Sequence, residues 1–250
     1  EVSKEIVESI EIPLPPLEEQ RRIAAILDKR DCLERWAQRR HGLLDELWKA
    51  EFIKRFGNPF SHHSQCPTAR LGEIASTSSG GTPKREVRAY FGGNIPWVKS
   101  GELSNPVVEV TEEFLTEDGL QNSSAKMLSP GVVLLAMYGA TAGAVSILGL
   151  PACTNQAICA IDPGKSVDSL YLADYLRLIT PALLAKRIGG AQPNLTQDII
   201  RNILVPIPRM EERESYILFR KRLASAAIDF SGSLIAASRL GSSCSQALLR

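Results

Sequence analysis

The stretch Pro13-Leu14-Pro15-Pro16-Leu17-Glu18-Glu19-Gln20 recurs in pattern near the other end of the chain, as Val205-Pro206-Ile207-Pro208-Arg209-Met210-Glu211-Glu212. Adding 193 to a position in the first copy gives its counterpart in the second, as for Pro13 and Pro206. Proline fixes φ and lacks an N–H, so each Pro-x-Pro predicts an extended segment that leads into a helix. The paired glutamates then fall in the first helical turn, where negative charge is favoured. We therefore expect a globular domain held between two matched helices.

Both segments carry apolar residues at alternating three- and four-residue steps, which is typical of a coiled-coil seam. We expect the first helix over residues 17–57, after a tail and proline segment at 1–16, and the second over residues 205–250. At about 1.5 Å per residue the first helix would be about 60 Å long, more than a small domain needs for its own core. A spacer or dimer arm is favoured, and an amphipathic helix packed on its own domain is the alternative. The expected helix–helix contacts are Ile23, Ile26, Leu33, Leu44 and Leu47 from the first helix, and Tyr216, Phe219, Leu223, Phe230 and Leu240 from the second.

Composition excludes a globally basic nucleic-acid binder. The 250 residues carry a net charge of +1, and Lys and Arg number 11 against 12 Asp and Glu between residues 66 and 205. Any nucleic-acid surface must therefore be a local patch. Five scattered cysteines without a C-x-x-C motif fit a reducing compartment, so we expect a cytoplasmic protein. His62, His63 and Cys66 favour a plain surface loop over a metal site, and we expect no metal.

The region between the helices mixes strands and helices. Residues 127–161 are uncharged, but glycines and prolines divide them into short apolar runs, which favours buried strands over a membrane span. Strands are expected over residues 132–138, 143–148 and 157–161, with shorter ones near 90–98 and 107–110. Residues 169–188 have helical apolar spacing, and Thr116 and Thr196 are suited to cap short helices. This order predicts an α+β domain with helical arms.

A set of short stretches is distributed along nearly the whole chain: Gly80-Gly81-Thr82-Pro83, residues 90–98, residues 130–135, Tyr138-Gly139-Ala140-Thr141, Asn155-Gln156, residues 192–196 and both proline–glutamate segments. In the order and spacing of these stretches, the chain resembles the specificity subunit of Type I restriction-modification enzymes. In that family two target recognition domains alternate with two long helices, which pack antiparallel and set the distance between two half-sites in DNA. The resemblance implies one mixed α/β target recognition domain over residues 58–204, flanked by helices that form an antiparallel coiled-coil arm. The chain is similar to the C-terminal half of such a subunit with the preceding helix, or to a short version that pairs with a second copy.

The resemblance also implies a non-catalytic subunit that reads one half of a bipartite target. Its expected partners are double-stranded DNA, methylation subunits that use S-adenosylmethionine, and a restriction subunit that uses ATP and magnesium. The chain itself is expected to hold no cofactor. Asn58-Pro59-Phe60 lacks the second proline of the amino-methyltransferase motif, and no G-x-x-x-x-G-K-[ST] loop is present. The alternative is a coiled-coil scaffold whose middle domain binds protein rather than DNA.

Base reading needs side chains with paired donors or acceptors, such as Arg for guanine and Asn or Gln for adenine. The cations that follow the glycine loop are the first choice for a groove-facing segment, with a solvated surface loop as the alternative. For the Tyr138 turn, Asn155-Gln156 and the Gln192–Asn194 loop, a structural role is the favoured alternative, and Trp97 is expected in the core. The candidate DNA-binding residues are Gly80, Gly81, Thr82, Lys84, Arg85, Arg88, Tyr90, Lys99, Tyr138, Thr141, Asn155, Gln156, Gln192 and Asn194.

Overall fold

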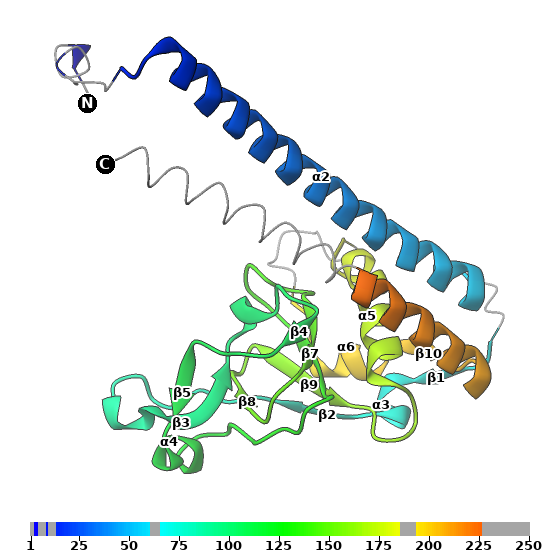
Figure 1. Ribbon diagram of the computed structural model, residues 1–250. Coiled ribbons are helices and arrows are strands. Elements are labelled where there is room, and N and C mark those ends of the chain that lie inside the picture. Colours follow the sequence, from blue (N-terminus) through cyan, green and yellow to red (C-terminus); the bar gives the residue numbers. More distant parts are fainter. Residues whose placement is uncertain (1–2, 5–8, 10–13, 61–65, 186–193, 227–250) are drawn as a thin grey trace. The chain divides into compact units, whose positions relative to one another are not determined.

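The computed structural model, drawn in Figure 1, describes residues 3–4, 9, 14–60, 66–185 and 194–226. The fold divides into two units, one made of residues 1–48 and 221–250 and the other of residues 49–220. The strands all belong to the second unit. Helices and sheets are mixed there, which confirms the predicted α+β class.

Helix α2 (Leu17–Phe56) is 40 residues long. It begins after Pro16, whose carbonyl accepts the N–H groups of Glu19 at 2.9 Å and Gln20 at 3.0 Å. Glutamates in the first turn and Lys and Arg in the last turn complement the helix dipole. Gly57 follows with φ of +86°, a backbone conformation that favours glycine and ends the helix.

The second long helix is described over residues 210–226. It starts later than the expected residue 205, because residues 204–206 form a strand and Pro206 and Pro208 keep the chain extended. Among the expected seam residues, Tyr216 is buried, Ile23, Ile26, Leu44, Phe219 and Leu223 are half-buried, and Leu33 and Leu47 are exposed. Phe230 and Leu240 lie outside the described residues. The coiled-coil seam therefore stays a prediction.

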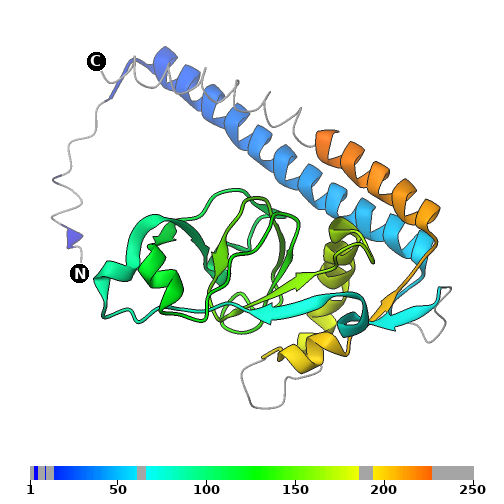
Figure 2. The ribbon, with the colours of Figure 1, turned by 90° about the horizontal axis from the view of Figure 1, so that it is seen from below.

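The larger sheet orders its five strands as β2 (Ser76–Ser79), β9 (Ile158–Asp162), β6 (Val133–Ala136), β7 (Val145–Leu148) and β4 (Val107–Val108). β6 is buried throughout and β9 is buried except at Asp162, as their apolar runs predict. β2 at the edge is built from Ser and Thr alone, so no apolar pattern announces it. Helix α5 (Ser169–Ala185) packs against β6 and β7 (Figure 2). Residues 186–188 of the expected helix lie outside the described residues.

The smaller sheet orders β5 (Glu113–Leu115), β3 (Phe91–Val98) and β8 (Cys153–Thr154). The register between β3 and β5 shifts between Phe91 and Ile95, where Gly92 has φ of +81°. Trp97 on β3 is 1% exposed, which confirms its predicted place in the core. The short helices beside this sheet are η1 (Arg88–Tyr90), η2 (Ser100–Glu102) and α4 (Glu117–Gln121), the last capped by Thr116 as predicted.

Two paired strands carry the chain into and out of this unit's sheets. β1 (Thr68–Arg70) runs antiparallel to β10 (Leu204–Pro206). Helix α3 (Leu71–Ile74) follows β1, and helix α6 (Gln197–Arg201), whose N-cap is the predicted Thr196, precedes β10. The hydroxyls of Tyr171 and Tyr175 on α5 donate to the carbonyls of Pro206 at 2.9 Å and Leu204 at 2.5 Å. These bonds fix the outgoing strand on the domain.

An aromatic cluster joins the ends of the two long helices. Phe52 and Phe56 from the last turns of α2 meet Tyr171 of α5 and Tyr216 of the second helix, and each is at most 2% exposed. The Phe52 ring centroid lies 5.3 Å from that of Tyr171 and 5.4 Å from that of Tyr216. Such pairs contribute about 0.5–1.5 kcal/mol each beyond the area they bury. All four of these residues belong to the same compact unit, residues 49–220.

Asp174 on α5 is a fully buried carboxylate beneath this cluster. Its oxygens accept hydrogen bonds from Tyr216 Oη at 2.9 Å, Arg220 Nε at 2.6 Å and Arg177 Nη1 at 2.9 Å. Burial, and then the Asp174 charge, raise the pKa of the Tyr216 hydroxyl, which therefore stays a donor. A buried charge persists only when it is paired and hydrogen-bonded, so Asp174 pins the second helix to α5.

The sequence predicts buried strands rather than a membrane span over residues 127–161. Among the described residues, no helix combines the length and the apolar character needed to cross a bilayer. His62 and His63 lie outside the described residues.

The Asp174 network predicts a large loss of stability on truncation. Asp174→Ala leaves two mostly buried guanidinium groups without their carboxylate and should lower the free energy of unfolding by about 3–5 kcal/mol. Asp198→Ala is the matched control, because that carboxylate is 89% exposed and its nearest cation lies 3.9 Å away. The control should change stability by less than about 1 kcal/mol in urea denaturation. Equal effects of the two substitutions would contradict the anchoring role of Asp174.

Candidate nucleic-acid interface

Strand register brings three polar loops to one end of the five-stranded sheet. β2 and β6 both run antiparallel to β9, with Ser79 opposite Cys159 and Ala136 opposite Ile158. The segments that follow β2 and β6 therefore leave the sheet at the same end as the segment that precedes β9. We call this end of the sheet the loop end, and define it by residues 80–83, 137–143 and 155–157.

A fourth segment joins the loop end through backbone hydrogen bonds. The N–H of Met137 donates to the carbonyl of Ala157 at 2.8 Å, and the carbonyl of Met137 accepts the N–H of Leu195 at 2.7 Å. Asn194, which is exposed, therefore lies beside the Tyr138 turn. Gln192 lies outside the described residues.

Two of the predicted residues meet directly across the loop end. The hydroxyl of Thr82 donates to Oε1 of Gln156, although 74 positions separate them in the chain. Gln156 is exposed and Thr82 is half-buried, so both present polar atoms at the surface. The neighbouring Oδ1 of Asn155 is buried and, within the described residues, has no hydrogen-bond partner. Asn155 thus points away from the surface that Gln156 occupies.

Gly80 and Gly81, two of the candidate DNA-binding residues, are packed inside the domain. Both are buried. The Gly81 N–H donates to the carbonyl of Thr154 at 2.9 Å, and the Gly81 carbonyl accepts the Trp97 indole N–H at 3.0 Å. A Cβ on Gly81 would lie 2.2 Å from the backbone nitrogen of Ala125. Because these glycines lack a Cβ, the loop can pack closely against backbone atoms of the core, and this packing positions Thr82.

Arg85 is held by an aromatic corner and a carboxylate. Its guanidinium carbon lies 4.8 Å from the Phe91 ring centroid and 4.9 Å from the Trp97 ring centroid, and its Nη1 donates to Glu113 Oε2 at 2.7 Å. Since the Trp97 indole also bonds Gly81, a continuous chain of contacts links Arg85 to Thr82 and Gln156. Arg85 is therefore connected to the loop end through the buried Trp97 and Gly81, and it follows Thr82 by three positions.

Lys99 completes this charged group. Its Nζ lies 3.0 Å from Glu112 Oε2 and 3.0 Å from Glu113 Oε1. Hydrogen bonds from Arg85 and then from Lys99 lower the pKa of Glu113, and bonds to Glu113 and Glu112 raise the pKa of Lys99. Glu113 and Lys99 therefore both stay ionised near neutral pH. Two of the predicted cations are thus partly neutralised by carboxylates that the sequence prediction left out.

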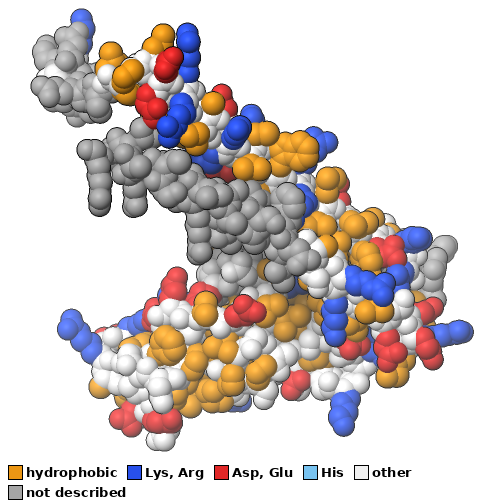
Figure 3. All heavy atoms as spheres, viewed as in Figure 1, with side chains coloured by type: hydrophobic (Ala, Val, Ile, Leu, Met, Phe, Trp, Pro, Cys, Tyr) orange, Lys and Arg blue, Asp and Glu red, His pale blue; other side chains and the backbone are white. Residues whose placement is uncertain are grey.

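The remaining candidates are spread around this surface. Lys84 and Arg88 are exposed and make no ion pair with the described residues. Tyr90 is half-buried, and its carbonyl accepts the Thr116 N–H at 3.0 Å. Tyr138 and Thr141 lie on the loop end, where burial raises the pKa of the Tyr138 hydroxyl. On the face shown in Figure 3, Lys and Arg side chains are interspersed with Asp and Glu, so the unit shows no broad basic field on that face.

Glu112, Glu113 and Gln197 were missed from the sequence. Glu113 lies opposite Trp97 through the β3–β5 register, and Gln197 Nε2 donates to Ser79 Oγ over 118 positions. No local pattern carries these pairings. To predict that Glu113 lies opposite Trp97, one would first have had to recognise β5 as a strand that pairs with β3.

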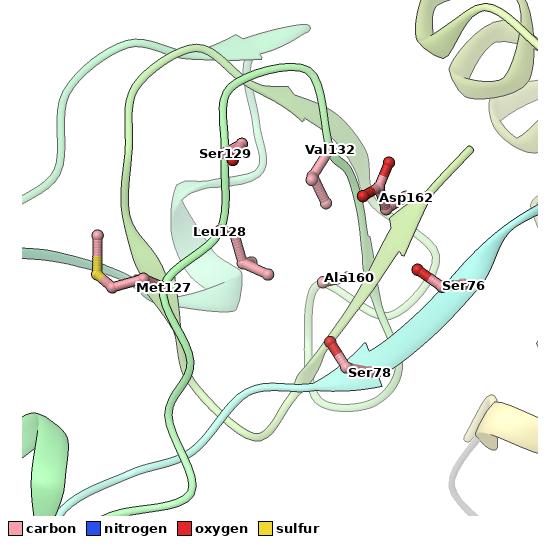
Figure 4. Close-up of a pocket in the computed structure, with 8 residues that line it drawn as sticks. All are labelled: Ser76, Ser78, Met127, Leu128, Ser129, Val132, Ala160 and Asp162. Carbon is pink, nitrogen blue, oxygen red and sulfur yellow. The ribbon is translucent and has the colours of Figure 1, made fainter. Parts of the chain in front are cut away.

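A small hollow of about 170 Å³ lies at the opposite end of the sheet. Figure 4 shows its lining, in which Ser76 and Ser78 come from β2 and Ala160 and Asp162 come from β9, while Met127, Leu128, Ser129 and Val132 close the other sides. Ser76 pairs with Asp162 in the ladder, three residues from the pair that borders the loop end. The hollow is therefore separate from the polar surface around Thr82 and Gln156.

The glycine packing predicts a sharp contrast between two alanine substitutions. Gly81→Ala forces a Cβ against backbone atoms of Ser124 and Ala125 and should destabilise the protein by about 1–3 kcal/mol. Gly101→Ala is the control, because nothing lies within 4 Å of its Cβ position. Thermal unfolding of both variants checks this, and equal midpoints would contradict the packing role of Gly81.

Comparisons with known proteins agree with this architecture. The family described as Type I restriction modification DNA specificity domain matches residues 1–38 and 65–223. The EcoR124I/EcoR124II specificity subunit of Escherichia coli is 24% identical over 153 residues, covering 59% of this chain and 38% of that protein. The MjaVIII specificity subunit of Methanocaldococcus jannaschii is 27% identical over 237 residues, covering 86% of this chain and 55% of that protein. The chain thus spans about half or less of the length of these relatives.

Solved structures share the fold. The HsdS subunit of Thermoanaerobacter tengcongensis superposes with a TM-score of 0.59 at 21% identity, covering 92% of this chain and 57% of that one. A chain from a structural study of type I R-M assembly and conformational transition gives a TM-score of 0.62 at 22% identity, covering 92% of this chain and 58% of that one. Nothing in these comparisons supports the alternative of a protein-binding scaffold. The chain belongs to the Type I restriction modification DNA specificity domain family.

Proposed function

We propose that residues 49–220 read one half of a bipartite sequence in double-stranded DNA, with the loop end and Arg85 facing the duplex. The observation that carries this is the bond between Thr82 and Gln156 at the loop end, with Arg85 connected to it through Trp97 and Gly81, in a chain whose family is a DNA specificity domain. Gln can bond adenine through two groups and Arg can bond guanine likewise. The exposed Lys84 and Arg88 are suited to phosphates, which position the protein without specifying sequence.

The subunit role is part of the same proposal. We infer that the chain catalyses no reaction itself and docks methylation subunits and a restriction subunit, as the family resemblance implies; its relatives are named specificity subunits of Type I restriction enzymes. With one recognition unit and about half the length of those relatives, it needs a second unit to read the other half-site, supplied by a second copy or by further sequence. The two long helices would set the spacing between the half-sites. Cysteines scattered along the chain without a C-x-x-C motif fit a reducing compartment, and we infer a cytoplasmic location from them.

Selection from a pool of randomised duplexes tests the reading role. The full chain, with methylation subunits present, should enrich a defined half-site, and its binding should weaken as salt rises because phosphate contacts release counterions. Equal recovery of every sequence would contradict base reading, and salt-independent binding would contradict phosphate contacts.

Two substitutions should separate reading from positioning. Arg85→Ala should weaken binding to the selected duplex by about 1–3 kcal/mol and relax one base position. Lys84→Ala should weaken binding to all duplexes alike and reduce the salt slope by about 1.

Lys165→Ala is the control for both substitutions. Lys165 is exposed and follows β9 at the end of the sheet opposite the loop end, so its loss should leave the selected sequence unchanged. The same relaxed base position in Lys165→Ala and Arg85→Ala would contradict the proposed surface.

A further inference from the structure

The side chain of Arg85 is unusually fixed for one that is 53% exposed. Two rings bound it, at 4.8 Å and 4.9 Å, and Glu113 binds its Nη1 at 2.7 Å. The rings of Phe91 and Trp97 are themselves tilted by 66° to one another and form a corner around the guanidinium. A long cation at a protein surface ordinarily samples many rotamers, and here that freedom is already restricted.

Glu113 is also fixed. It lies on β5 opposite the buried Trp97, and its second oxygen lies 3.0 Å from Lys99 Nζ. Both carboxylate oxygens are therefore engaged, one by each cation. The Arg85 guanidinium is thus held by Glu113 and Trp97, and Trp97 is buried in the core of the domain.

Reading guanine requires two parallel N–H donors aimed at O6 and N7, so the plane of the guanidinium decides whether the pair forms. Glu113 takes a bond from only one of the five N–H donors that a guanidinium carries. We propose that Glu113 is a positioning residue that orients Arg85 to read a guanine in the target. This inference rests on the proposed function, since it assumes that the loop end faces DNA.

A different role is open to a carboxylate at a DNA-binding surface. It can simply repel phosphates and weaken binding to every sequence. Glu112 supplies the comparison, because it neighbours Glu113, is 76% exposed and contacts Lys99 without contacting Arg85. Substitution of either glutamate by glutamine removes one negative charge from nearly the same place, and only Glu113→Gln replaces the charged partner of Arg85 and weakens the bond that orients it.

The experiment compares wild type, Glu113→Gln and Glu112→Gln in selection from randomised duplexes, using the full chain with its methylation subunits. Both variants should bind unselected duplexes somewhat more tightly. Glu113→Gln should lose preference for one guanine by roughly 5-fold or more, the range of one bidentate contact. Glu112→Gln should keep that preference.

Arg85→Lys secures the assignment independently of any folding defect in Glu113→Gln. It keeps the charge at a half-exposed position and removes the planar fork, so it should lose preference at the same guanine as Glu113→Gln. Unchanged preference in Glu113→Gln, equal loss in both glutamine variants, or loss at a position different from that of Arg85→Lys overturns the inference while the proposed function stands. A wild-type chain without any sequence preference overturns both.

Discussion

The antiparallel pairing of β2 and β6 with β9 is the constraint on which the candidate interface depends. It places Ser79, Ala136 and Ile158 at one end of the sheet, so the loops next to them lie side by side although they are far apart in sequence. β9 and β6 are buried, so a shift in the register of their pairing would move apolar side chains out of their places in the core. The polar residues that follow these strands can therefore differ in chemistry while the scaffold stays fixed, which is the usual division between a rigid sheet and functional loops.

The same unit also fixes how the chain enters and leaves it. β1 pairs with β10, the tyrosines of α5 bond β10, and Phe52, Phe56 and Tyr216 bring the ends of both long helices into one buried cluster. A domain whose two ends are joined in this way can be inserted between helices without separating them.

Sequence reasoning reached the elements with local signals and missed those set by distant partners. Apolar runs predicted β6, β7 and β9, and threonine caps predicted α4 and α6. β2 was missed because its Ser and Thr carry no apolar pattern, and β5 because three residues give no period. At the candidate site, Arg85 was chosen for its chemistry, Thr82 for its place in the resemblance, and Gln156 with a structural role as the favoured alternative; their contact with DNA stays a prediction. The burial of Gly80 and Gly81 and the contact of Glu113 with Arg85 follow from pairings that only the fold reveals.

Hydrogen exchange of the whole protein with and without a selected duplex tests the central claim, that the loop end faces DNA, most directly. The account predicts that the duplex slows amide exchange in residues 80–85, 137–142 and 155–157, and leaves exchange unchanged in residues 127–132 and 162–166 at the opposite end of the sheet. Slowed exchange at the opposite end, with none at the loop end, would contradict it.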